Sequence, residues 1–158
     1  CFEDLVILNC MYRPGPMEYI STLVRQKHSK KAVKYIIPCM EKYLHNTYGI
    51  IVYQEQIMML SRLIANFDRG ESDLLRKALG KKKMDVLSVL KLRFIQGGIK
   101  NGHKKNALEK VWNEMEAKGM YAFQKSHAVC YTWLAYQIAY LKANYPDEFK
   151  QALEKYSD

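Results

Sequence analysis

The sequence contains few of the residues that usually build metal or catalytic centres. Its four cysteines are scattered, with no CxxC pair and no set of histidines near them at the spacing of a zinc site. The GxSxG and HExxH patterns are absent, and so is any Asp-x-Asp pair that could hold magnesium. Because two-metal phosphoryl transfer requires clustered carboxylates, we expect no metal site and no catalytic residue in this chain.

Long apolar runs are also absent. No stretch approaches the roughly 18 uninterrupted apolar residues of a membrane span, and residues 1–4 lack the charged start and apolar run of a signal peptide. These absences argue against a membrane partner and favour a cytoplasmic protein whose cysteines are reduced and mostly structural. The chain begins with Cys-Phe-Glu and has no initiator methionine, so we expect a fragment of a longer polypeptide.

Hydrophobic residues make up 49% of the 158 positions, which is enough for one ordinary globular domain with its own core. The formal net charge is +9. Residues 76–110 hold eleven lysines and arginines against only Asp85 and Glu109, so this segment alone carries the whole excess. Such a basic segment suits phosphate groups. A solvated lysine-rich helix face without a partner is the alternative.

Hydrophobic periodicity predicts helices, and nothing alternates convincingly as a strand. Apolar residues repeat at intervals of four, three, four and three along one stripe of a long helix: Tyr53, Ile57, Leu60, Ile64 and Phe67. Two prolines around a glycine fix a turn over residues 12–16 that a helix cannot cross, and residues 29–34 have the composition of an exposed connection. We therefore expect an all-α fold, with residues 1–158 forming one domain of about six helices with irregular connections.

Capping residues and glycines indicate where the other helices begin and end. Asp68 and Glu71 stand at N-cap and N3 spacing for a short helix that stops near Gly80. Its expected core residues are Leu74, Leu75 and Ala78. A third helix is expected to open at Asp85 and to close at the Gly97-Gly98 pair, with Leu87, Leu90 and Phe94 facing inward.

Two further helices and a short terminal turn complete the predicted fold. Apolar spacing marks a fourth helix that ends at Gly119, with Leu108, Val111, Trp112 and Met115 as its core residues. Ser126 is expected to cap a fifth helix over residues 127–144, and Pro146 to begin a last short helical turn. On the fifth helix we expect the aromatic residues to be core rather than a stacking platform: Tyr131, Trp133, Tyr136 and Tyr140.

A cationic turn is the first candidate binding site. Five basic side chains fall within eight residues around Gly80: Arg76, Lys77, Lys81, Lys82 and Lys83. Arginine offers forked donors to phosphate oxygens and lysine a mobile point charge, so this turn could grip a triphosphate. It is not a P-loop, because the GxxxxGK[ST] order is absent. A solvated surface is the alternative.

The second candidate site is the segment Phe-Gln-Lys-Ser-His-Ala at residues 123–128. A helix start offers free amides and partial positive charge to an anion, and an aromatic or imidazole ring can stack on a base. In the alternative, Ser126 only caps the helix and His127 only packs. Among the carboxylates, Glu55 within the run Tyr-Gln-Glu-Gln is the one placed where it could be functional.

Several of these runs, in this order, resemble the fingers of the bacterial C-family replicative DNA polymerases, the polymerase III alpha subunits. The matching runs are YRPGPM at 12–17, YGIIVYQEQIM at 48–58, LLRKALGKKK at 74–83 and FQKSHAVCYTWLAYQIAYLKANYPDEF at 123–149. The resemblance covers essentially the whole chain. It implies that residues 1–158 are part of the fingers and that the palm, thumb, PHP and C-terminal domains lie outside them.

The resemblance implies a template-directed polymerase whose palm holds the magnesium ions while the fingers bind the incoming deoxynucleoside triphosphate. This fragment alone would bind substrate, carry no cofactor and be inactive. Implied partners are deoxynucleoside triphosphates, primer-template DNA and, for the longer protein, a sliding clamp, a clamp loader and a proofreading subunit. The residues implied near the triphosphate are Arg76, Lys77, Lys81 and Lys82.

The family also implies which residues lie by DNA. Those expected near the nascent base pair are Phe123, Gln124, Lys125, Ser126 and His127, while Arg13, Tyr53 and Gln54 would support the site or approach DNA. The sequence departs from the family at two of these positions. The family commonly has arginine where Lys77 stands, so Lys77 keeps the positive charge but lacks the paired N–H donors of a guanidinium. It commonly has asparagine where Gln124 stands, so the side-chain amide of Gln124 lies one methylene further from the backbone.

Three hypotheses for the chain therefore remain. In the first, it is the nucleotide-gripping part of a polymerase, and activity depends on Arg76 and on residues 125–127. In the second, it is a stand-alone helical module that binds duplex DNA with a steep salt dependence. A purely structural role predicts neither behaviour.

Overall fold

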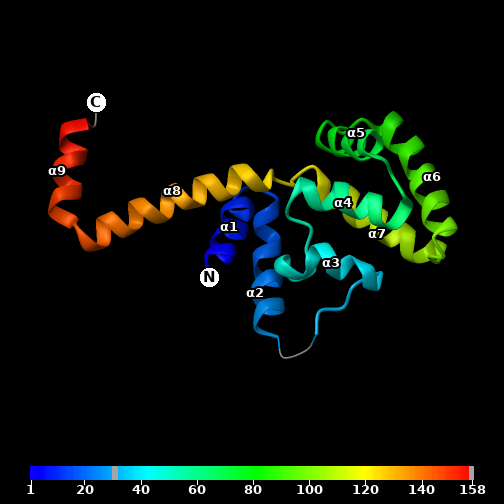
Figure 1. The fold of residues 1–158 in the computed structure, drawn as a ribbon, viewed down its shortest axis with the longest axis horizontal. Helices are drawn as coiled ribbons and strands as arrows, with labels where there is room; N and C mark the ends of the chain where they lie inside the picture. Colours follow the sequence, from blue (N-terminus) through cyan, green and yellow to red (C-terminus); the bar gives the residue numbers. More distant parts are fainter. Residues whose placement is uncertain (30–31, 157–158) are drawn as a thin grey trace.

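The chain folds almost entirely into helices in a computed structural model that describes residues 1–29 and 32–156 (Figure 1). The α-helices are α1 Phe2–Met11, α2 Ile20–His28, α3 Glu41–Leu44, α4 Gln54–Ala65, α5 Arg69–Gly80, α6 Met84–Lys100, α7 Lys105–Gly119, α8 Lys125–Asn144 and α9 Pro146–Tyr156. Three short 3₁₀ helices occupy Pro16–Tyr19, Pro38–Met40 and His45–Thr47. The all-α prediction is confirmed, although about six helices was too few.

The larger of two buried clusters lies between α3, α4, α5, α6 and α7. Its fully buried members include Leu60, Ile64 and Phe94, and Phe94 makes a tilted ring contact with Trp112 at 5.6 Å between centroids. All five side chains of the stripe predicted along residues 53–67 are buried, but α4 spans only Gln54–Ala65, so Tyr53 and Phe67 lie just outside the helix. Helix α4 therefore forms the centre of this half of the molecule.

The smaller cluster joins α1 and α2 to the start of α8. Val6, Ile7 and Cys10 on α1 pack with Ala128 on α8 and with the extended residues 50–53 that precede α4. Burial raises the pKa of the Cys10 thiol to about 11, so this side chain is an uncharged core group at neutral pH. The extended residues 50–53 run along the boundary between the two clusters.

Capping chemistry sets the start of α5 as the sequence predicts. The Asp68 carboxylate accepts the Glu71 amide at 2.7 Å, and the Glu71 carboxylate accepts the Asp68 amide at 2.9 Å. This reciprocal capping box satisfies two amides that a helix start otherwise leaves without partners. The prediction that Leu74 is core is wrong, since Leu74 is 47% exposed while Leu75 and Ala78 are buried.

Helix α6 differs from its prediction at both ends. It begins at Met84 with Lys83 as N-cap, so Asp85 lies in the first turn and does not cap the helix. Gly97 and Gly98 do not close it, because the helix continues to Lys100. They serve close packing: a Cβ on Gly97 would lie 2.2 Å from the Ala65 carbonyl oxygen, and one on Gly98 would meet the Leu108 side chain.

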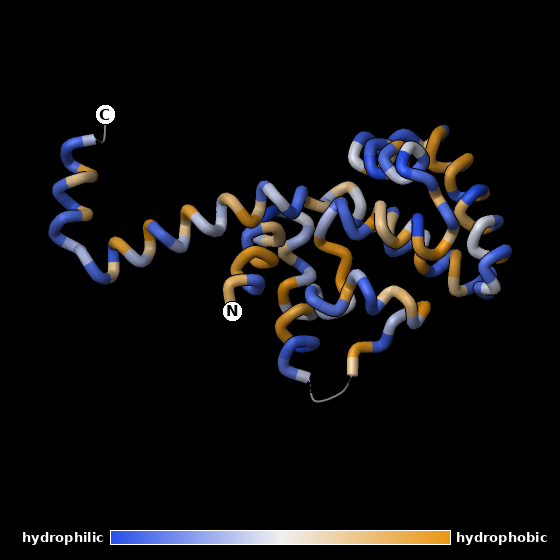
Figure 2. The backbone as a smooth tube through the Cα atoms, viewed as in Figure 1, coloured by the Kyte–Doolittle hydropathy of each residue, from blue (hydrophilic) through white to orange (hydrophobic). Residues whose placement is uncertain are grey.

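Helix α8 extends away from the rest of the molecule, and α9 leaves its far end at a sharp angle (Figure 1). The expectation that its aromatic residues are core is therefore wrong within this chain: Tyr131, Trp133, Tyr136 and Tyr140 are all at least half exposed. Hydrophobic and hydrophilic residues alternate along this part of the chain (Figure 2), and its exposed apolar side chains include Leu134, Ile138 and Leu141. None of the helices in the described ranges is long and apolar enough to cross a lipid bilayer.

The connection expected at residues 29–34 falls partly outside the described residues, since the structure describes Ser29 and residues 32–34 but not 30 and 31. Residues 32–34 have no regular secondary structure, which agrees with the prediction for that part. The turn over residues 12–16 is confirmed as the break between α1 and the first 3₁₀ helix. At Gly15, φ is +96°, which favours glycine.

The contact between α6 and α4 provides a test of the packing. Gly97→Ala should lower the free energy of unfolding by about 2 kcal/mol or more, because the new methyl group meets backbone atoms that must move. Gly80→Ala is the matched control: its Cβ meets nothing within 4 Å, so stability should change by less than about 1 kcal/mol. Urea unfolding measures both, and equal stabilities would contradict the packing described here.

Candidate functional site

Two segments far apart in the sequence pair at the starts of α4 and α8. The Phe123 amide donates to the Val52 carbonyl at 2.9 Å, and the Gln54 amide donates to the Phe123 carbonyl at 3.0 Å. These two bonds form a parallel bridge between Tyr53 and Phe123, the one bridge found in the described part of the chain. The two helices that carry candidate residues therefore start side by side.

The buried side chain of Gln56 fixes the first half of this bridge. Its oxygen accepts the amides of Val52 and Tyr53, each at 2.9 Å, and its nitrogen donates to the Thr47 hydroxyl at 2.8 Å. Every polar atom of a buried amide needs such a partner. Tyr53 is buried, and that burial raises the pKa of its phenol above its ordinary value, so the ring is neutral.

Gln54 connects the bridge to α5. Its side-chain nitrogen donates to the Ala122 carbonyl at 3.2 Å, and its side-chain oxygen accepts from the Arg76 guanidinium at 3.4 Å. A glutamine can do both because its amide carries a donor and an acceptor at one tip. The predicted triphosphate residue Arg76 is thus tied, through one side chain, to the segment that leads into α8.

Asp73 holds the basic pair on α5. Its carboxylate accepts from the Arg76 guanidinium at 2.7 and 2.9 Å and lies 2.7 Å from the Lys77 ammonium. The lysine and then the guanidinium keep the pKa of Asp73 below its ordinary value. Sequence analysis did not name Asp73, although its spacing of three and four residues from two cations is the signature of helix ion pairs.

Lys81 and Lys82 lie exposed on the turn after α5. The turn closes when the amides of Lys82 and Lys83 donate to the carbonyls of Leu79 and Ala78, with Lys82 in the left-handed region at φ +51°. These two lysines therefore lie past the end of α5, and neither of them is a hydrogen-bond partner of the Gln54 side chain, which binds Ala122 and Arg76. Their positive charges face solvent together with those of Lys83.

Glu55 sits against the first turn of α8. Its two carboxylate oxygens accept the Lys125 amide at 3.1 and 3.2 Å. The N-cap residue is Gln124 and not Ser126, so the predicted cap is wrong by two residues. An acidic side chain at a helix N-terminus is favoured by the free amides and the helix dipole. The helix start predicted to bind an external anion already has a carboxylate beside it.

The side chains of the segment 123–127 form a short aromatic series. The His127 ring lies 5.4 Å from the Phe123 ring and 4.6 Å from the Tyr131 ring, measured between centroids. The Lys125 ammonium lies over the Tyr53 ring at 5.5 Å. Gln124, Lys125, Ser126 and His127 are all exposed. This face offers rings, a cation and a hydroxyl to solvent at the point where the two segments pair.

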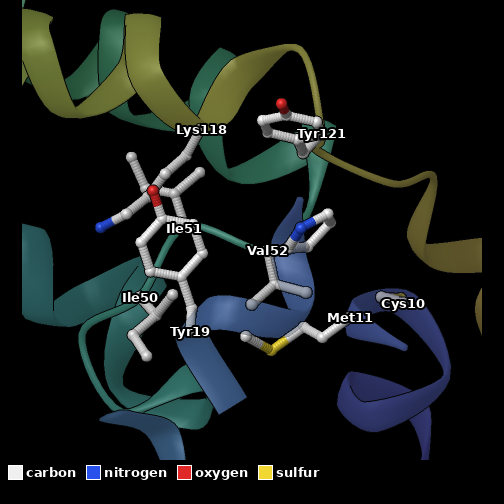
Figure 3. Close-up of a pocket in the computed structure, with 9 residues that line it drawn as sticks. Cys10, Met11, Tyr19, Ile50, Ile51, Val52, Lys118 and Tyr121 are labelled. Carbon is white, nitrogen blue, oxygen red and sulfur yellow. The ribbon is translucent and has the colours of Figure 1, made fainter. Parts of the chain in front are cut away.

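Arg13 binds the segment that carries Phe123 and so stabilises the bridge. Its guanidinium donates to the carbonyls of Cys10 at 2.9 Å and Tyr121 at 2.8 Å, and it lies 4.7 Å from the centre of the Phe123 ring. A small cavity of about 20 Å³ adjoins this region, and Figure 3 shows it walled by Val52, Met11 and the Tyr19 and Tyr121 rings. The space is that of about one water molecule, so it cannot take a substrate.

The structure therefore brings most of the predicted site residues into one connected region. Contacts and hydrogen bonds link seven of them: Arg13, Tyr53, Gln54, Arg76, Phe123, Lys125 and His127. Lys77 joins through Asp73. Within residues 1–29 and 32–156, no three His, Cys, Asp or Glu side chains come together as a metal site would require, so the residues present do not fit a magnesium ion.

The sequence profile described as the bacterial DNA polymerase III alpha subunit finger domain matches residues 1–102. The chain belongs to this family. It is 44% identical over 150 residues to the DNA polymerase III subunit alpha of Aquifex aeolicus, which covers 94% of the chain but 13% of that relative. The same protein of Thermus aquaticus is 44% identical over 156 residues, covering 96% of the chain and 13% of the relative.

The finger-domain chain thus spans about an eighth of the length of these relatives. The DNA polymerase III subunit alpha of Borreliella burgdorferi is likewise 44% identical over 150 residues, which cover 95% of the chain and 13% of that relative. The resemblance seen in the sequence motifs is confirmed. The matched residues 1–102 include Arg13, Gln54, Asp73 and Arg76, while the pairing segment at 122–123 lies past the profile's end.

The carboxylate that holds the basic pair can be tested directly. Since the folded-state pKa of Asp73 is lowered, its contribution to stability is present above about pH 4 and is lost as the pH falls through the folded value. In an NMR titration, Asp73 should have a midpoint below 3.8 in the wild type. Lys77→Met should move the midpoint up and Lys77→Arg should not. An Asp73 midpoint that is the same in Lys77→Met as in the wild type would contradict the ion pair between Asp73 and Lys77.

Proposed function

We propose that this finger-domain chain binds the incoming deoxynucleoside triphosphate and the nascent base pair in a DNA-directed DNA polymerase. The observation that carries the proposal is the hydrogen-bonded link from Arg76 through Gln54 to residues 122–123. This link connects a guanidinium, whose paired N–H groups can donate to phosphate oxygens, with the series of rings at the start of α8. In this proposal the phosphates lie against α5 and the following turn, and the base pair lies against the start of α8.

Arg76 is the principal triphosphate ligand in this proposal. Its side chain is 30% exposed and its guanidinium is oriented by Asp73, so little rotamer freedom is lost when phosphate binds. Lys77, Lys81 and Lys82 add mobile charges on the same helix end and turn. The net charge of residues 76–110 supports this role, because a polyphosphate is attracted to a concentrated basic segment.

The start of α8 supplies the contacts for the base pair. Lys125, Ser126 and His127 are exposed there, and Phe123 and Tyr131 flank the imidazole. Rings of this kind stack on bases whatever their sequence. In this proposal Arg13, Tyr53 and Gln54 act mainly by positioning this segment, since they bind its backbone: Arg13 donates to the Tyr121 carbonyl, Gln54 donates to the Ala122 carbonyl, and Tyr53 pairs with Phe123. Gln124, the N-cap residue of α8, is also exposed at this helix start.

For the longer protein we propose the activity of a replicative polymerase. Magnesium would be held by carboxylates outside this chain, in a palm, and the fragment alone would be inactive. The relatives carry the name subunit alpha, which supports assembly with further replicase subunits such as a clamp, a clamp loader and a proofreading subunit. Helix α8 exposes eight large hydrophobic side chains between Val129 and Leu141, which supports function within a larger polypeptide that covers them. Because bacterial DNA is cytoplasmic, the protein would act there.

Arg76→Ala in the full-length polymerase should lower kcat/KM for single-nucleotide incorporation by about 10- to 100-fold, because a charge-assisted bond to phosphate is lost. The measurement varies the deoxynucleotide concentration and determines primer-template affinity separately, which should stay the same. Arg62→Ala is the matched control, since Arg62 is an exposed arginine on α4 that lies outside the proposed site.

Unchanged incorporation kinetics in Arg76→Ala would remove the triphosphate assignment. A loss of primer-template affinity with unchanged nucleotide dependence would instead assign the basic segment to DNA. Arg76→Lys distinguishes charge from geometry, because lysine retains the charge but not the paired donors. It should recover only part of the lost kcat/KM.

A further inference from the structure

Helix α6 exposes an apolar stripe on the side opposite the core. Val89 and Leu92 are each 66% exposed, and Ile99 is 49% exposed. With Gln96, they repeat at intervals of three, four and three residues, so they form one line along the helix. At about 1.5 Å per residue, the line is about 15 Å long.

This stripe lies outside both buried clusters. The inner side of α6 already supplies Leu87, Leu90 and Phe94 to the core and brings Gly97 and Gly98 against α4 and α7. A surface helix with one buried face normally presents polar residues on the other. Apolar patches on the surface of soluble proteins mark interaction surfaces, and here three aliphatic residues share one line with a single uncharged polar residue, Gln96.

Positive charge lies at the C-terminal end of the stripe. Lys100 follows Ile99 directly, and Lys104 and Lys105 lie exposed at the start of α7. Lys105 is only loosely paired, with its ammonium 3.9 Å from the Glu109 carboxylate. A partner that covers the stripe would therefore meet three lysines at this end, and carboxylates are the groups that complement them.

We propose that the outer face of α6 is a docking surface for an acidic amphipathic helix of another protein. The aliphatic side chains Val89, Leu92 and Ile99 would pack against about three turns of the partner, and its acidic residues would face Lys100, Lys104 and Lys105. The surface is separate from the residues proposed to bind nucleotide, so it goes beyond that function. It gives the finger domain a protein contact on its outer side.

The composition of the stripe favours a protein over a nucleic acid. Interfaces with DNA are more polar and more strongly basic than those with proteins, whereas the line from Val89 to Ile99 carries no charged side chain. Single strands are bound by stacking on aromatic rings, and this face of α6 has none. A cross-link from this stripe to DNA would therefore contradict the proposal.

The test places a photo-cross-linking residue at position 92, and in a second variant at position 96, of the full-length polymerase in living cells. Mass spectrometry of the cross-linked products should identify one segment of a second protein that is acidic and amphipathic. Leu92→Glu in the variant with the cross-linker at 96 should abolish the product. Leu74→Glu, a change at an exposed leucine on α5, should leave it intact.

A synthetic peptide of the cross-linked sequence then provides the affinity. Leu92→Glu in the full-length polymerase should raise its Kd by about tenfold or more, while single-nucleotide incorporation on a short template should be unchanged. The proposal is overturned by a lack of any cross-link at both positions, or by a cross-link to DNA or to the polymerase itself. A cross-linked segment without acidic residues, or equal Kd values for both polymerases, also overturns it.

Discussion

Two backbone hydrogen bonds between residues 52–54 and 122–123 determine how the finger domain is arranged. The pairing lies where the two buried clusters meet: Ile51 and Ala122 belong to the cluster around α4, whereas Val52 and Tyr53 belong to the cluster of α1, α2 and the start of α8. The pairing satisfies the Gln54 amide, which as the first helical residue of α4 would otherwise lack a partner. It therefore fixes where α8 begins relative to α4 and α5.

Side chains reinforce this pairing from three directions. Gln56 holds the amides of Val52 and Tyr53, Arg13 holds the Tyr121 carbonyl, and Glu55 holds the Lys125 amide. Gln54 adds the link to Arg76 on α5. These polar contacts, several of which join residues far apart in the sequence, hold the geometry of the proposed nucleotide site together with the buried residues Val52, Tyr53 and Ala122.

Local patterns in the sequence predicted the helical class, the stripe along α4 and the capping box of α5, because each depends on residues only a few positions apart. They failed where distant packing decides. Gly97 and Gly98 were expected to stop α6, yet they let α4 and α7 approach it. The pairing of Tyr53 with Phe123 joins residues that no periodicity connects. The α8 aromatics, in turn, are exposed because this chain contains little that could cover them.

Hydrogen exchange resolved to single amides, on the full-length polymerase, tests the pairing most directly. The amides of Gln54 and Phe123 should exchange about 100-fold or more slowly than in an open peptide, because both are donors in the pairing. The Ser126 amide, in the first turn of α8, provides a comparison that should exchange fast. If Gln54 and Phe123 exchange as fast as Ser126, the two segments do not pair, and the proposed link between α5 and α8 is contradicted.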